Sequence, residues 1–196
     1  GIDACKIYLE QRKSKTFSTS LLAKLMKLVL KSNVMTFGSI IFHQVKGTAM
    51  GTPMAVSYAN LFMNWFETNM LNEYEKLYNK KPEMWYRFID DIFFVWLGDE
   101  KSLKHFLSFC NLYSKNHGLK SNIGFTYSYS PKKVNFLDTS VTLENDGTLS
   151  TNLYCKPASV HQYLNKQSCH PQHTITAIPK SQFIRIRRIC THLDDN

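Results

Sequence analysis

The sequence predicts an α+β protein in which helices cover one face of an antiparallel sheet. Short runs rich in β-branched and aromatic residues recur along the chain, with turn-forming residues between them. Segments with the apolar spacing of helices separate these runs, in the order strands, helix, hairpin, helix, strands. The chain has 196 residues, of which 43% are hydrophobic, and this content is sufficient for a packed core.

Two helices are expected at the N-terminus. Residues 1–12 have the apolar spacing of a helix, and a polar linker, residues 13–19, follows them. Ser20 is suited to cap a second helix that continues to about Lys31. The apolar residues of this second helix share one face, which we expect to be buried: Leu21, Leu22, Leu25, Leu28 and Val29.

A loop with two glycines connects the next predicted elements. Residues 34–45 are typical of a pair of strands, and residues 54–78 of a long helix. The loop between them, residues 46–53, contains Gly47 and Gly51, which lack a Cβ atom and let a backbone approach a ligand closely. The same spacing also occurs in ordinary strand-to-helix turns, so the loop alone does not indicate a function.

Two adjacent carboxylates interrupt the aromatic run of residues 85–96. The run predicts a hairpin with Asp90 and Asp91 at its tip. Ionised groups next to apolar side chains lose hydration, so such a pair requires open solvent or a compensating cation. A surface hairpin with an acidic turn is the alternative, but two-residue turns prefer Asn-Gly or Asp-Gly. On these residues alone, the metal site and the surface hairpin both stay open as interpretations.

The C-terminal half begins with a helix and continues with strands. Asp99 is suited to cap a helix that Gly118 ends. From Lys156 the composition becomes polar and basic, and a small helical subdomain is expected from about Pro171. Three strand-like segments lie between these parts: residues 123–130, 134–144 and 148–154.

The composition indicates a basic intracellular protein. Lys and Arg number 24 against 15 acidic residues, which favours nucleic acid as the partner and an anionic membrane second. No apolar run approaches the length of a membrane span, and the N-terminus lacks the pattern of a signal peptide. Five widely spaced cysteines indicate a reduced chain. The C-terminal Cys and His residues match no paired zinc-ligand pattern: Cys155, His161, Cys169, His170 and His173.

Four segments carry a resemblance to a known family. They are Gln44 to Ala55 running into Tyr58 to Met63, then Phe88-Ile89-Asp90-Asp91, then Val134 to Asp138, and last Leu153 to Pro171. In these segments and in their order, the chain resembles the reverse transcriptase domain of Penelope-like retroelements, which are relatives of telomerase. The first segment is similar to the family's template-contacting motif, and the second to its metal-binding box.

This resemblance implies the right-hand polymerase fold. Residues 34–170 would form the palm, an antiparallel sheet with helices on one face. Residues 1–33 would be helices that connect fingers and palm, and residues 171–196 would be the start of a truncated helical thumb. The location implied is intracellular and nuclear.

The resemblance also implies a reaction, RNA-directed DNA synthesis by two-metal nucleotidyl transfer. The partners would be an RNA template, a DNA primer and deoxynucleoside triphosphates. Asp90 and Asp91 would hold two Mg²⁺ or Mn²⁺ ions. Contacts to the template and the nucleotide would come from Gly47, Met50, Gly51, Pro53, Phe88 and Lys133. Lys133 is equally typical of a solvated turn.

One motif of the family is not matched. Its first catalytic Asp lies on a strand that would precede Gly1, and neither Asp3 nor Asp138 is in a position to replace it. We therefore expect the chain to be an incomplete polymerase domain that is inactive alone. The alternative is a non-catalytic remnant of such a domain that binds nucleic acid.

Overall fold

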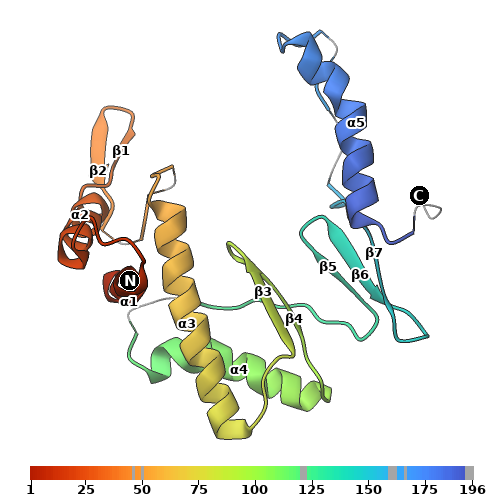
Figure 1. Cartoon of the computed structure of the whole chain (residues 1–196), viewed down its shortest axis with the longest axis horizontal. Helices are drawn as coiled ribbons and strands as arrows, with labels where there is room; N and C mark the ends of the chain where they lie inside the picture. Colours follow the sequence, from red (N-terminus) through yellow and green to blue (C-terminus); the bar gives the residue numbers. More distant parts are fainter. Residues whose placement is uncertain (46, 50, 120–122, 159–162, 166, 193–196) are drawn as a thin grey trace. The chain divides into compact units, whose positions relative to one another are not determined.

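A computed structural model of the chain describes residues 1–45, 47–49, 51–119, 123–158, 163–165 and 167–192. These residues form helices and small antiparallel sheets, which confirms the α+β class (Figure 1). The chain folds into two compact units, one made of residues 1–90 and 94–124 and the other of residues 91–93 and 125–196. The finer arrangement as a polymerase palm, with boundaries near residues 33 and 170, stays a prediction.

The first unit begins with helices α1 (Ile2–Gln11) and α2 (Thr19–Lys31), which pack against each other. The Ser18 hydroxyl accepts a hydrogen bond from the Leu21 amide at 3.2 Å, so Ser18 caps α2. The prediction of Ser20 as the cap was wrong, because Thr19 and Ser20 already have helical conformation. Both residue types suit a cap, and their position along the chain does not distinguish them.

The prediction of a buried leucine face on α2 was also wrong. Leu21, Leu25, Leu28 and Val29 are 36–62% exposed, and Ala23 is the buried residue of this helix. The hairpin formed by β1 (Val34–Phe37) and β2 (Ile40–His43) is exposed along both strands. Apolar periodicity identifies the face that is suited to burial, but burial itself requires a neighbouring element, and no described element covers this face.

The core of the first unit lies between α3 (Ala55–Tyr78) and α4 (Glu100–Asn116), which cross each other (Figure 1). Aromatic rings meet edge to face in this core: the centroids of Tyr74 and Phe106 are 4.9 Å apart, and those of Phe66 and Tyr113 are 5.3 Å apart. Asp99 accepts a hydrogen bond from the Ser102 amide at 3.1 Å, so the predicted cap of α4 is confirmed.

The predicted acidic hairpin is confirmed as β3 (Met84–Phe88) and β4 (Asp91–Val95), which pair with each other. Trp85 stacks on Phe94 with a centroid distance of 5.4 Å, and both rings contact Phe106 of α4 edge to face. This packing holds the hairpin on the core of the first unit.

The second unit contains a sheet in the order β5 (Lys133–Phe136), β6 (Thr139–Leu143), β7 (Leu149–Leu153) and a helix, α5 (Gln172–Ile189). Two expectations were wrong. Residues 134–144 are two strands, because the chain turns at Leu137 and Asp138, and residues 123–130 form no strand. Alternation of apolar and polar residues is therefore compatible with a segment that is not a strand.

Hydrogen bonds join the C-terminal end of helix α5 to β7, the edge strand of this sheet. The Thr191 amide donates to the Thr151 carbonyl at 2.8 Å, and the Thr151 amide donates to the Thr191 hydroxyl at 2.8 Å. The Thr151 hydroxyl also donates to the Ile189 carbonyl. These bonds join the chain after α5 to β7, so the helix and the sheet form one body.

Candidate active site

Asp90 and Asp91 lie at the tip of the β3–β4 hairpin. Ile89 and Asp90 form its two-residue turn, and Asp91 is the first residue of β4. Both aspartates are exposed, and neither carboxylate makes a hydrogen bond or ion pair with another described residue. Carboxylate oxygens are ligands that Mg²⁺ and Mn²⁺ prefer, so the donor set fits such an ion.

The turn holds Ile89 in an unusual backbone conformation. Its φ angle is +56°, and β-branched residues rarely adopt positive φ angles. A conformation of this kind costs about 1–3 kcal/mol and persists where the surroundings enforce it. Arg87 contributes to that enforcement, because its Nη1 atom donates to the Ile89 carbonyl at 3.0 Å.

Arg87 is held in turn by two residues of α3. Its Nε atom lies 2.8 and 3.0 Å from the two carboxylate oxygens of Glu67, and its Nη1 atom donates to Asn60 Oδ1 at 2.7 Å. The side chains of Arg87 and Glu67 are only 11% and 8% exposed. Burial raises the pKa of the Glu67 carboxyl, and the hydrogen bond and positive charge of Arg87 oppose this rise.

These contacts place the acidic turn and the glycine-containing loop at the same end of α3. Asn60 lies five residues after Ala55, the first residue of the helix, and therefore about 7.5 Å along its axis. The loop leads directly into this end, since the Ala55 amide donates to the Thr52 carbonyl at 2.9 Å. Residues about forty positions apart in the sequence thus approach the N-terminal part of one helix.

The loop offers exposed backbone. Gly47 and Gly51 have φ angles of +79° and +88° and are exposed. Leaving aside its two chain neighbours, a Cβ atom at Gly51 would meet no atom of the described residues within 4 Å, so the space beside it is open. Pro53 is also exposed and lies in the turn just before α3, whereas Met50 lies outside the described residues. The loop therefore presents backbone to solvent, as a ligand-contacting loop must.

Two further predicted contact residues are exposed. Phe88 is the last residue of β3 and is 56% exposed. Lys133 belongs to the second unit, where it is the first residue of β5. Its side chain is exposed, while its backbone amide donates to the Ser130 hydroxyl at 3.2 Å. Their roles toward template and nucleotide stay predictions.

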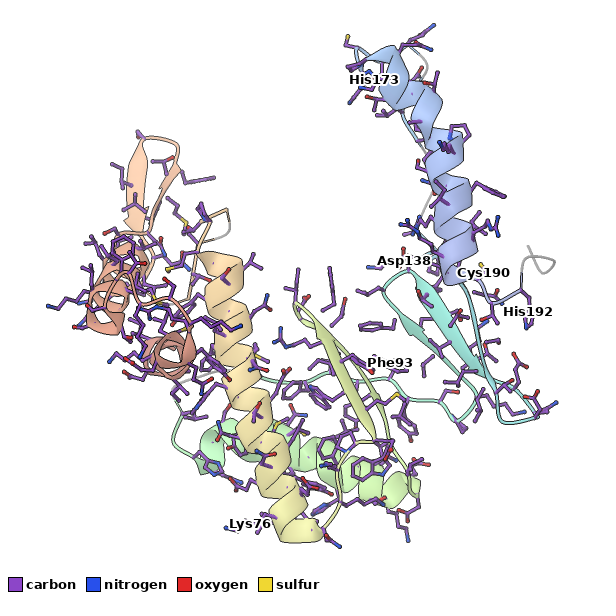
Figure 2. The ribbon with its side chains drawn as sticks, in the orientation of Figure 1. Lys76, Phe93, Asp138, His173, Cys190 and His192 are labelled. Carbon is purple, nitrogen blue, oxygen red and sulfur yellow. The ribbon has the colours of Figure 1, made fainter. Side chains whose placement is uncertain are left out.

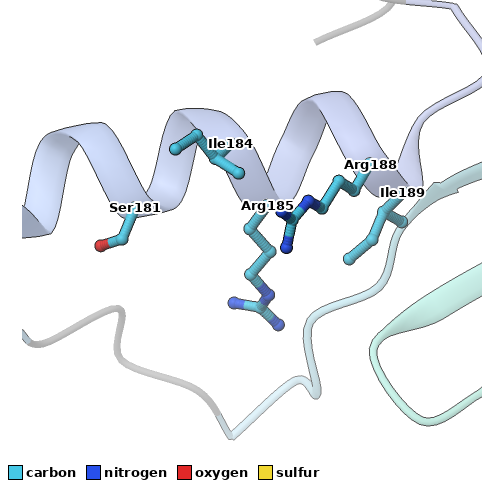
Figure 3. A pocket seen from close by; sticks show the side chains of 5 residues that line it. All are labelled: Ser181, Ile184, Arg185, Arg188 and Ile189. Carbon is cyan, nitrogen blue, oxygen red and sulfur yellow. The ribbon is translucent and has the colours of Figure 1, made fainter.

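The second unit carries a basic helical face. An open hollow of about 450 Å³ on α5 is lined by Ser181, Ile184, Arg185, Arg188 and Ile189 (Figure 3). Arg185 forms an ion pair with Asp138, the turn residue between β5 and β6 that lies near the C-terminal end of α5 (Figure 2). Its Nη2 and Nε atoms are 2.6 and 3.0 Å from Asp138 Oδ2. Arg187 and Arg188 are exposed.

Further acidic ligands are not gathered at the Asp90–Asp91 turn. Among the described residues, no group of three or more His, Cys, Asp or Glu side chains is arranged to hold a metal ion. Asp3 accepts a hydrogen bond from the Lys6 ammonium group at 2.8 Å, and Asp138 forms an ion pair with Arg185. The turn alone therefore supplies two carboxylates, fewer than a two-metal site requires.

Comparison with known proteins finds a match at the C-terminus. Residues 162–196 match the family model of an animal helix-turn-helix domain, and α5 is the described helix within this range. No curated protein and no solved structure matches the chain. Helix-turn-helix domains are typically nucleic-acid-binding modules, so the match suggests nucleic acid as a partner. None of the described helices has the length and apolar character needed to span a membrane.

The sequence analysis did not identify the residues that hold the turn. Asn60 and Glu67 are two of several polar residues on α3 and lie seven positions apart, and Arg87 is a charged residue within an aromatic strand. A spacing of seven places both polar residues on one helical face, which is a signal for a common buried partner. The identity of that partner becomes visible only in the folded structure.

Proposed function

We propose that this chain is part of the RNA-directed DNA polymerase domain of a Penelope-like retroelement. One observation carries the proposal: the Asp90–Asp91 turn is exposed, unpaired and strained, and Arg87 ties it to the end of α3 that the glycine-containing loop enters. An exposed acid pair on an anchored turn is what metal-assisted phosphoryl chemistry requires. The match of the C-terminal segment to a nucleic-acid-binding module supports the same partner class.

Each part of the proposed site has a physical task. Two divalent ions, when bound, activate the primer 3′ hydroxyl and neutralise charge on the leaving pyrophosphate. Asp90 and Asp91 provide oxygen ligands. The backbone at Gly47 and Gly51 passes close to the template and the nucleotide, where side chains would collide. Lys133 is proposed from the family resemblance as the cation that would neutralise charge on the leaving pyrophosphate.

The exposed arginines of α5 suit the phosphate backbone of a duplex. Phosphate contacts fix the position of a protein on nucleic acid without reading its sequence. A polymerase that copies any template needs contacts of this kind. A retroelement enzyme acts where the chromosomal DNA is, so we propose a nuclear location.

A non-catalytic remnant that binds nucleic acid is the second candidate. It is favoured by the small number of acidic ligands at the turn, because two carboxylates neutralise two divalent ions only in part. The two candidates make the same prediction for nucleic-acid binding and different predictions for metal binding.

Titration of the chain with Mn²⁺ distinguishes them. Water proton relaxation should report a weak Mn²⁺ site that Asp90→Asn removes. Asp146→Asn is the matched control, since Asp146 is an exposed turn acid of the β6–β7 hairpin. This control should leave Mn²⁺ binding unchanged. Equal binding by the wild-type chain and Asp90→Asn would favour the remnant.

Binding of a labelled RNA/DNA hybrid tests the partner in the same three proteins. All three should bind alike, because the carboxylates contribute little to contacts with phosphates. The affinity should fall roughly a thousandfold between about 50 and about 200 mM salt if about six phosphates are contacted. A logarithmic plot without slope would exclude nucleic acid as the partner.

A further inference from the structure

We propose that Arg87 is a positioning residue that fixes the geometry of the Asp90–Asp91 turn through its hydrogen bond to the Ile89 carbonyl. Glu67 and Asn60 hold the Arg87 side chain in place. This inference rests on the proposed function and names a residue that touches neither substrate nor metal. It predicts that the acid pair is preorganised by a buried guanidinium, which connects the turn to α3.

The bonds of Arg87 are arranged so that the aspartates stay available. Glu67 pairs with the guanidinium at 2.8 Å, and Arg87 then contacts the turn through the Ile89 carbonyl. The positive charge is thereby directed toward Glu67. An arginine placed beside Asp90 itself would compete with a metal ion for its oxygens.

A second hairpin of the chain shows the opposite arrangement. The sequence Phe136-Leu137-Asp138 repeats the pattern of Phe88-Ile89-Asp90, and Leu137 has a φ angle of +55°, almost the same as that of Ile89. In this second turn an arginine, Arg185, binds the aspartate side chain. Two turns whose first residues have nearly the same φ angle thus differ in what their arginine binds: in one the carbonyl, in the other the carboxylate.

The shape of the guanidinium explains why this position requires arginine. Nε faces Glu67, while Nη1 reaches both Asn60 and the Ile89 carbonyl. A lysine ammonium is a compact charge on a flexible stem and cannot reproduce this fixed fork. Arg87→Lys therefore keeps the charge near Glu67 and loses the simultaneous contacts that fix the turn.

Backbone relaxation of the ¹⁵N-labelled chain tests the inference without any metal. In Arg87→Lys, the order parameters of Ile89, Asp90 and Asp91 should fall from values near about 0.85 to below about 0.6. Arg185→Lys is the matched control, because it makes the same change at the other hairpin, and it should leave these three residues unchanged. Asn60→Ala removes one hydrogen-bond partner of Arg87 and leaves the ion pair between Arg87 and Glu67. This variant should lower the order parameters by an intermediate amount, and it keeps the inference testable if Arg87→Lys does not fold.

Metal binding provides the second readout. Partners that orient metal ligands typically change affinity about 10- to 100-fold when they are replaced, so Mn²⁺ binding that depends on Asp90 should weaken by this factor in Arg87→Lys. A folded Arg87→Lys or Asn60→Ala chain with a wild-type turn and wild-type Mn²⁺ affinity would overturn the inference. A turn that loosens in a chain without any Mn²⁺ site at Asp90 would instead support the positioning role and refute the polymerase.

Discussion

At the scale of single residues, burial determines which side chains can react. All five cysteines are free thiols, and Cys5, Cys110 and Cys190 are buried, whereas Cys155 and Cys169 are exposed. Burial raises the pKa of the Cys110 thiol from 9.0 to about 12. The thiolate is the reactive form, so this side chain is doubly protected, by its protonation and by the surrounding atoms.

Thiol labelling at pH 8 measures this protection. Cys155 and Cys169 should react with a disulfide reagent within the mixing time, and Cys110 should react only as fast as the core between α3 and α4 opens. Labelling of Cys110 at the rate of Cys155 would contradict the described core.

The folded chain holds the Cys110 proton up to a higher pH than the unfolded chain does. The contribution of the protonated Cys110 thiol to the free energy of unfolding should therefore be lost as the pH rises from 9 toward about 12.

At the scale of elements, the loop before α3 combines a demanding backbone with open space. Gly51 needs a positive φ angle, which costs other residues about 1–2 kcal/mol. Gly38, in the turn between β1 and β2, also has a positive φ angle, +61°. An added Cβ atom there would meet no atom of the described residues within 4 Å, apart from its two chain neighbours. The two glycines therefore differ mainly in whether a ligand is expected beside them.

Alanine at each position isolates the ligand. Gly51→Ala and Gly38→Ala should lower the free energy of unfolding by a similar amount, about 1–2 kcal/mol, in urea titrations. Only Gly51→Ala should also weaken hybrid binding, by about fivefold or more, because its methyl group enters the space that nucleic acid would occupy. Equal effects of both variants on hybrid binding would show that the loop has a purely structural role.

The same scale shows what the sequence was able to predict. The hairpin, α3 and α4 follow from local signals: an aromatic run, helical periodicity, and Asp99 as a cap. The exposed face of α2 and the absence of a strand at residues 123–130 were missed because burial and strand pairing depend on neighbours that are distant in sequence. Within the candidate site, the position of Asp90 and Asp91 at a hairpin turn follows from their pattern. Arg87 was missed because its partners lie 20 and 27 positions away.

At the scale of the whole molecule, the charge and the C-terminal match agree on the partner. A net charge of +9 favours a polyanion, and residues 162–196 match a helix-turn-helix domain. The acid pair is an exception in this basic chain, since it would repel nucleic acid unless cations lie between them. A divalent ion at the turn, as proposed for metal-dependent polymerisation, would resolve this conflict.

Primer extension on an RNA template tests this central claim most directly. The proposal requires a third catalytic Asp and a thumb, so the protein to use is one in which these parts of the resembled family are supplied together with the 196 residues; the 196-residue chain alone should show little or no synthesis. We predict that the DNA primer is extended and that this extension requires Mg²⁺ or Mn²⁺. Asp90→Asn should abolish extension and leave hybrid binding intact, whereas Asp146→Asn should leave extension unaffected. Extension that persists in Asp90→Asn, or a well-folded extended chain that binds the hybrid without extending the primer, would contradict the account.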